Sequence, residues 1–105
     1  MLGLERAEGN MILWDAGVLV GADDQAGYAK AHALLMTMVK RVKELSVSVG
    51  TEADFVYLNY ADASQDPIGS YGEGNIAFMK EVAQRYDPME VFQKRVPGGF
   101  KVSRV

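Results

Sequence analysis

The hydrophobic and polar positions divide the first half of the chain into an apolar stretch and a long periodic one. Residues 10–20 are almost continuously apolar and rich in strand formers, which predicts a strand buried on both faces or at a subunit contact. Residues 24–49 have apolar positions every three or four residues, which predicts a long amphipathic helix. Asp23 or Asp24 can cap its start, and Gly50 can cap its end. The apolar stripe of this helix consists of Tyr28, Ala31, Leu35, Met38, Val39, Val42, Leu45 and Val49.

The second half of the chain predicts a short strand, a loop and a second helix. Residues 55–61, FVYLNYA, predict a short strand, and the Asp, Ser, Pro and Gly residues at 62–74 predict a loop. A second helix is predicted from about residue 73 to residue 86. It must end at Asp87-Pro88, because the residue before a proline avoids helical backbone angles.

A third, short helical turn is predicted directly after this stop. Asp87 would be its cap, Pro88 its first helical position and Glu90 the partner in a capping box. We expect Val91 and Phe92 to anchor this turn in a hydrophobic core.

Two strands and two helices predict an α+β chain with a short antiparallel sheet, one long helix and one shorter helix. We expect a single domain over residues 1–105. Two strands alone are marginally stable, and the strand at 11–20, which includes Trp14, would leave a long apolar edge exposed. The sequence therefore predicts that another subunit or a larger partner chain covers this strand.

Composition narrows the class of protein. The 105 residues suit one domain, and a hydrophobic content of 49 % argues against disorder. A net charge of −3 argues against a general nucleic-acid or anionic-membrane surface, so the basic run at residues 40–44 is interpreted as a solvated helix face. The chain has neither the apolar run of about 20 residues that a membrane helix needs nor the pattern of a signal peptide.

The reactive side chains exclude several kinds of catalysis. Cysteine is absent, which removes disulfides, thiolate nucleophiles and thiolate metal sites. His32 is the single histidine, so we predict no metal site, because carboxylates alone would have to supply it. His32 lies beside the apolar stripe of the long helix, which favours a structural role.

Residues 72–77, GEGNIA, fit the G-x-G-x-x-A pattern of a dinucleotide fingerprint, with Asp87 or Glu90 as the acid that would bind the ribose. The surrounding pattern does not fit, since ten residues that include Pro67 separate the first glycine from the preceding strand. Too little chain follows Tyr86 for the returning parallel strand. A glycine turn before an ordinary helix is the favoured interpretation.

Polar tips mark the short strand at 55–61. Tyr57, Asn59 and Tyr60 stand where a strand that only fills a core would have Val, Ile or Leu, and a buried polar tip must find a partner. Either these tips are satisfied structurally or they line a site. In a regular strand Tyr57 and Asn59 share a face while Tyr60 points away, so a common pocket needs a bend, which the loop at 61–67 could supply.

The ordered motifs of the chain resemble a known family. They are similar to the C-terminal segment of FAD-linked oxidoreductases of the berberine-bridge-enzyme-like group, fungal type. Residues 51–105 resemble the C-terminal segment itself, and residues 1–50 resemble the last strand and helix of the substrate domain. The matching pieces are Tyr57-Leu58-Asn59-Tyr60, Tyr71-Gly72 with Asn75, Tyr86-Asp87-Pro88 with Val91-Phe92-Gln93, and Pro97-Gly98-Gly99-Phe100-Lys101.

This resemblance implies flavin chemistry on a small organic substrate, with FAD as the cofactor. Tyr60 would be the base that takes a substrate hydroxyl proton, and Tyr57 would line the substrate pocket and assist catalysis. Asn59 and Asn75 would lie by the flavin, and Gln65 and Tyr71 would contact the substrate. A tyrosine acts as a base only if a positive charge or hydrogen bonds stabilise its anion.

In the family a large N-terminal domain binds most of the flavin, often through a covalent link to histidine, and that domain is missing from these 105 residues. Three hypotheses follow. In the first, the chain is a part or a truncated homologue of an FAD-linked oxidoreductase of secondary metabolism. In the second, it is a flavin-free homodimer that binds or cyclises a small molecule. In the third, it is a non-catalytic remnant that assembles with a larger partner.

Overall fold

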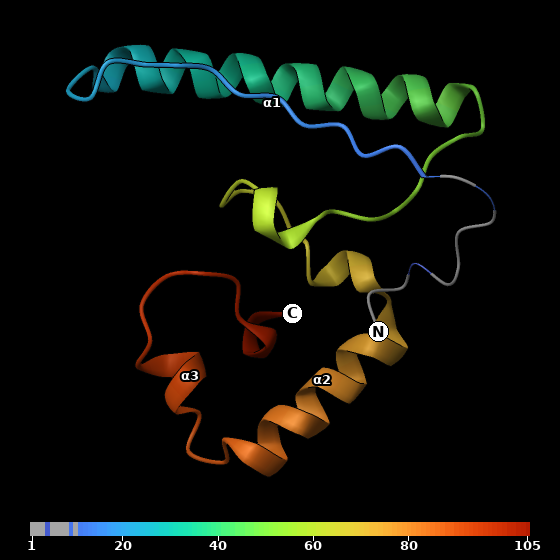
Figure 1. Cartoon of the computed structure of the whole chain (residues 1–105), viewed down its shortest axis with the longest axis vertical. Coiled ribbons are helices and arrows are strands. Elements are labelled where there is room, and N and C mark those ends of the chain that lie inside the picture. Colours follow the sequence, from blue (N-terminus) through green and yellow to red (C-terminus); the bar gives the residue numbers. More distant parts are fainter. Residues whose placement is uncertain (1–3, 5–8, 10) are drawn as a thin grey trace. The chain divides into compact units, whose positions relative to one another are not determined.

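The computed structural model describes residues 4, 9 and 11–105. These residues fall into two compact units: Ile12–Ala53 is one, and residues 4, 9 and 11 together with residues 54–105 form the other. The regular elements from residue 11 onward are α1 (Gln25–Ser48), η2 (Leu58–Tyr60), η3 (Gly69–Tyr71), α2 (Glu73–Tyr86), α3 (Val91–Lys94) and η4 (Val102–Arg104), all of them helical (Figure 1).

The predicted α+β class with an antiparallel sheet is wrong for the described part of the chain, which contains no strand. Residues 11–20 have no regular secondary structure, and Asn10, the first residue of the predicted strand, lies outside the described residues. Residues 55–57 are likewise irregular, and a 3₁₀ turn follows them. Strand-forming side chains favour an extended backbone, but a strand also needs a second backbone to accept its hydrogen bonds.

Helix α1 begins and ends where local signals place it. The Asp24 carboxylate accepts a hydrogen bond from the Gly27 N–H at 2.8 Å, as a helix N-cap does. At the other end Gly50 has a φ of 69°, in the left-handed region that favours glycine. The N–H of Gly50 donates to the Val47 carbonyl at 3.1 Å and that of Thr51 to the Ser46 carbonyl at 2.9 Å. This pair of bonds is a Schellman motif, which confirms the predicted glycine cap.

No residue of α1 is buried within the structure. The segment at residues 12–20 runs in the opposite direction to α1, and the turn at residues 21–24 joins the two (Figure 1). Its side chains are nevertheless not covered by the helix, since Ile12 is 93 % and Leu19 102 % exposed. The basic run at 40–44 is solvated as predicted, since Lys40 is mostly exposed and pairs with Glu44 at 3.8 Å. No helix in the described part of the chain combines the length and apolarity of a membrane span.

The unit that contains residues 54–105 has a small core of its own, built on the turn at residues 66–71. Pro67, Ile68 and Tyr71 are buried, and the Tyr71 ring stacks on Phe55 with 5.8 Å between ring centroids. Helix α2 contacts η3 and η4, and the Lys80 ammonium donates to the carbonyl of Val105. The core therefore lies in the proline turn itself, against Phe55 and directly before the start of α2.

Helix α2 ends at Tyr86, as the Asp87-Pro88 pair predicts. Asp87 does cap the following turn, because its two carboxylate oxygens accept from the N–H groups of Val91 at 2.8 Å and Phe92 at 2.9 Å. Pro88 and Glu90 do not have their predicted places, since α3 begins at Val91 and Glu90 has a left-handed φ of 53°.

The predicted core position of Phe92 is also wrong, because its side chain is 66 % exposed, and that of Val91 is 41 % exposed. Polar bonds hold this region in place of apolar contacts. The Lys101 ammonium donates to the Phe92 carbonyl at 3.1 Å, and the Ser103 N–H donates to the Gln93 side-chain oxygen at 3.3 Å.

Candidate functional site

The turn at residues 66–71 positions the segment that carries the candidate tyrosines. The Asp66 carboxylate accepts from the Gly69 N–H at 2.9 Å, which closes the turn around Pro67. The buried Ser70 hydroxyl donates to the Pro67 carbonyl at 2.6 Å and accepts from the Val56 N–H at 3.0 Å. Ser70 therefore ties the backbone immediately before Tyr57 to the core of the unit.

The 3₁₀ helix η2 brings the two tyrosines of the candidate site together. A 3₁₀ helix has three residues per turn, so side chains three positions apart lie on the same side. The rings of Tyr57 and Tyr60 meet edge to face, with centroids 5.3 Å apart and planes at 86°. The bend that a common site requires is therefore present, but it lies at residues 58–60 and not in the loop at 61–67.

Asn59 joins this group through a hydrogen bond that sets the direction of the Tyr57 hydroxyl. The Asn59 amide nitrogen donates to the Tyr57 hydroxyl oxygen at 2.9 Å. Because the oxygen accepts this bond, the hydroxyl proton of Tyr57 is available to an acceptor elsewhere. Tyr57 is half-buried, whereas Tyr60 is 71 % exposed, so the group presents one anchored phenol and one accessible phenol. We call Tyr57, Asn59 and Tyr60 the Tyr57–Tyr60 cluster.

Gln65 lies in the loop that follows. Its side-chain oxygen accepts from the Asp62 N–H at 2.8 Å, and its own N–H donates to the Asp62 carbonyl at 2.9 Å. Asp62 in turn accepts from the N–H and the hydroxyl of Ser64 at 2.9 and 2.6 Å. The Gln65 side chain thus closes a turn, and its contact with a substrate stays a prediction.

Tyr71 and Asn75 form a second group at the start of α2. Tyr71 is 4 % exposed in the core, and the Asn75 amide donates to the Tyr71 carbonyl at 2.9 Å. Gly72, with a φ of 88°, is the N-cap residue of α2. The first glycine of the GEGNIA motif therefore stands in a turn before an ordinary helix, and Gly74 lies in the first turn of that helix. The proposed ligand roles of Tyr71 and Asn75 stay predictions.

Two residues of this region went unnoticed in the sequence. Ser70 and Asp62 determine how the loop folds, through the hydrogen bonds given above. A signal for Asp62 was available, because an Asp two residues before a Ser is typical of a turn in which the carboxylate binds the backbone. Ser70 gave no such signal, since its partner Val56 is fourteen residues away.

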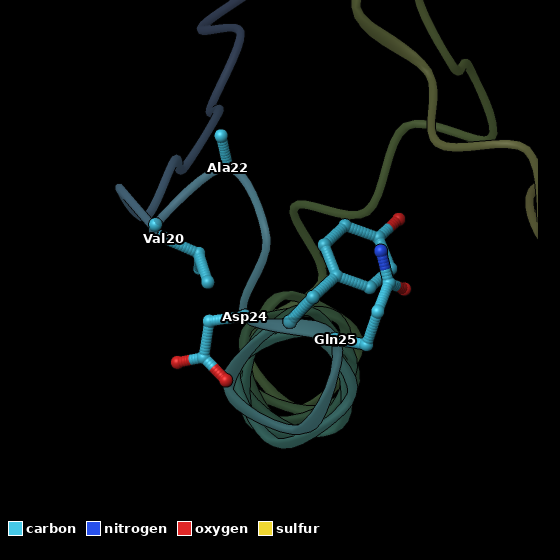
Figure 2. A pocket seen from close by; sticks show the side chains of 6 residues that line it. Val20, Ala22, Asp24 and Gln25 are labelled. Atoms are coloured by element: carbon cyan, nitrogen blue, oxygen red, sulfur yellow. The ribbon is translucent and has the colours of Figure 1, made fainter.

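A separate cavity of about 310 Å³ lies at the N-terminal end of α1 (Figure 2). It is lined by Val20, Gly21, Ala22, Asp24, Gln25 and Tyr28. None of the predicted site residues lines this cavity, and its carboxylate, Asp24, already serves as the cap of α1.

Comparison with known proteins shows that the chain is homologous to part of fungal proteins named FAD-dependent monooxygenases. The FAD-dependent monooxygenase sdcF of Emericella nidulans is 40 % identical over 99 % of this chain. The FAD-dependent monooxygenase drtC of Aspergillus calidoustus is 48 % identical over 65 % of it, and the bifunctional solanapyrone synthase of Alternaria solani is 35 % identical over 70 %.

The chain spans only a small part of these relatives, namely 21 % of sdcF, 13 % of drtC and 14 % of the solanapyrone synthase. No family model matches the chain, and no solved structure matches it. The names of sdcF and drtC agree with the FAD-linked part of the resemblance seen in the sequence. The finer assignment to the berberine-bridge-enzyme-like group stays a prediction.

Proposed function

We propose that the chain is a part of an FAD-linked oxidoreductase that acts on a small organic molecule, in secondary metabolism. The observation that carries this proposal is homology to an FAD-dependent monooxygenase over 99 % of the chain. It is supported by the Tyr57–Tyr60 cluster, because two phenols and an amide gathered at an accessible position suit a wall of a substrate pocket.

The residues fit one side of a flavin ring and not a complete FAD site. The Tyr57–Tyr60 cluster offers an aromatic face and hydrogen-bonding groups, which suit the edge of a planar ring. The pyrophosphate of FAD needs a positive or neutral cradle, but Glu73 lies in the first turn of α2, where its carboxylate opposes an anion. We therefore propose that Asn59 and Asn75 contribute to the flavin environment and that the rest of the oxidoreductase binds the phosphates.

When bound, FAD would supply a two-electron acceptor for the substrate. The chain's own residues would position the substrate and move a proton. Tyr57, whose oxygen accepts from Asn59, would donate its hydroxyl proton to a substrate oxygen. Tyr60 is exposed and would accept the proton of a substrate hydroxyl as the base, with a positive charge or hydrogen bonds from the rest of the oxidoreductase stabilising its anion.

A chimera tests this proposal. The segment of sdcF that matches this chain would be replaced by the chain, and both the visible flavin absorbance and the turnover of the reaction of sdcF would be measured. We expect a yellow, active chimera. Tyr60→Phe should lower kcat by about 10²–10⁴-fold, because a general base acts in the transition state, and should leave the flavin content unchanged.

Tyr86→Phe is the matched control, since Tyr86 is 74 % exposed at the far end of α2 and should behave like the unchanged chimera. Tyr57→Ala should instead weaken substrate affinity through lost contact area. A folded but colourless chimera would contradict the flavin role, and equal kcat values for Tyr60→Phe and Tyr86→Phe would remove Tyr60 from the reaction.

A further inference from the structure

Helix α1 has one continuous apolar face that its own unit leaves exposed. Its large members recur at spacings of three and four residues, so they lie in one row along the helix. We call it the α1 apolar face; its residues and exposures are Leu34 (59 %), Met38 (43 %), Val42 (38 %), Leu45 (63 %) and Val49 (61 %).

Charged side chains border this face but do not interrupt it. At 100° per residue, Lys30, Lys40, Arg41, Lys43 and Glu44 all fall outside the arc of the five apolar residues. Two ion pairs hold part of this charged side, Lys40 with Glu44 at 3.8 Å and Lys43 with Glu52 at 3.2 Å. The helix thus has a solvated side and a side that is suited to a protein interior.

The size of the face requires a partner. From Leu34 to Val49, the C-cap residue of α1, it extends about 22 Å, at 1.5 Å per residue. Proteins rarely leave a contiguous apolar surface of this kind in water, and a helix gains most of its stability from burying such a face. No residue of α1 is buried, so the unit that contains it does not supply the cover.

We infer that the α1 apolar face packs against the remaining polypeptide of an FAD-linked oxidoreductase, which rests on the function proposed above. The relative sdcF matches 99 % of this chain and is nearly five times as long as the matched stretch, which leaves about four-fifths of that protein to provide a cover. In sdcF the matched stretch belongs to the same polypeptide as this remainder. A second copy of the chain is the competing occupant, and the experiment separates the two.

Two neighbouring substitutions in the chimera give a matched test. Met38→Lys places a charge in the α1 apolar face, whereas Thr37→Lys places the same charge one residue away on the solvated side. Both lysines favour a helix, so the isolated 105-residue chain should show equal helix content by circular dichroism for the two variants. In the chimera, burial of an unpaired charge should lower the yield of folded protein about tenfold or more for Met38→Lys only.

A second measurement uses separate chains. The sdcF polypeptide without its matching segment is mixed with the purified 105-residue chain, and association is measured by analytical ultracentrifugation. The inference predicts association that Met38→Lys weakens about tenfold relative to Thr37→Lys, with Met38→Leu restoring it. If the 105-residue chain forms a dimer that only Met38→Lys disrupts, while the chimera tolerates that change, a second copy is the occupant and the inference is overturned.

Equal behaviour of the two lysine variants in every measurement would also overturn it, since the face would then be solvent-exposed. The flavin spectrum keeps this test apart from that of the proposed function. A chimera that is colourless but loses folding with Met38→Lys alone contradicts the flavin role while it supports the packing of α1.

Discussion

The two compact units of the chain hold their apolar residues in opposite ways. In the unit that contains residues 54–105, a proline turn folds back on itself and buries Pro67, Ile68 and Tyr71. In the unit Ile12–Ala53, a helix of 24 residues exposes most of its large apolar side chains, and Leu35, Met36 and Val39 are only half-buried. Strong apolar patterning is thus not sufficient for a core. A core forms where the chain reverses within a few residues, and a long straight helix must be covered by something else.

The largest expected effect comes from opening the core of the unit that contains residues 54–105. Tyr71→Ala should cost about 3–5 kcal/mol of unfolding free energy, because it removes a buried ring that stacks on Phe55. Phe92→Ala is the matched control, since that ring is 66 % exposed and should cost far less. Urea titration followed by near-ultraviolet circular dichroism measures both, and equal midpoints would show that this unit has no distinct core.

A smaller effect is expected at the polar attachment of α3. Asp87→Ala should destabilise the turn by about 1–2 kcal/mol, because the carboxylate accepts two backbone N–H groups at 2.8 and 2.9 Å. Asp87→Asn retains one carbonyl oxygen and should cost less. Amide hydrogen exchange at residues 91–94 reports the change, and unaltered protection in Asp87→Ala would mean that the cap does not stabilise α3.

A pair of glycines compares the two units directly. A Cβ atom at Gly69 or at Gly27 would lie 2.1 Å from the Oδ2 atom of Asp66 or Asp24, so Gly→Ala breaks the same kind of cap at each. Within α1, alanine is preferred over glycine by about 1 kcal/mol, which offsets the lost cap. At Gly69 no long helix compensates, and we expect a net cost of about 1 kcal/mol. In thermal unfolding, Gly69→Ala should have a lower Tm than Gly27→Ala, and the reverse order of the two Tm values would contradict the comparison.

The smallest effect is expected from the surface charges of either unit. Lys43→Ala breaks the ion pair with Glu52 at 3.2 Å, yet the two side chains are 64 % and 32 % exposed. Solvent and salt screen such pairs, so the change should be below about 0.5 kcal/mol. Lys94→Ala, which breaks the exposed pair with Glu90 in the other unit, should cost as little. A midpoint shift that disappears in high salt for only one of them would show that charge matters more to that unit.

For the candidate site, the sequence supplied the residues and the structure supplied their grouping. Tyr57, Asn59 and Tyr60 stood out because polar tips interrupt an apolar run. In a strand, Tyr57 and Tyr60 would point to opposite faces. The 3₁₀ turn instead brings the centroids of their rings to 5.3 Å from each other. The backbone before this turn is held by Ser70, which acts over fourteen residues and leaves no trace in the local pattern.

The sequence by itself determined the two longer helices, α1 and α2, and their ends, because these depend on neighbours in the chain. The Asp24 cap, the Gly50 motif and the Asp87-Pro88 stop each act within a turn or so of the backbone, so their letters are sufficient. Only the tertiary structure decided whether the two predicted strands form and whether Phe92 is buried. A strand needs hydrogen bonds to a distant backbone and a core residue needs distant side chains around it. Residues 11–20 have the side chains of a strand, but no second backbone pairs with them among the described residues. Phe92 has the side chain of a core residue, but within the described part of the chain its ring stays exposed.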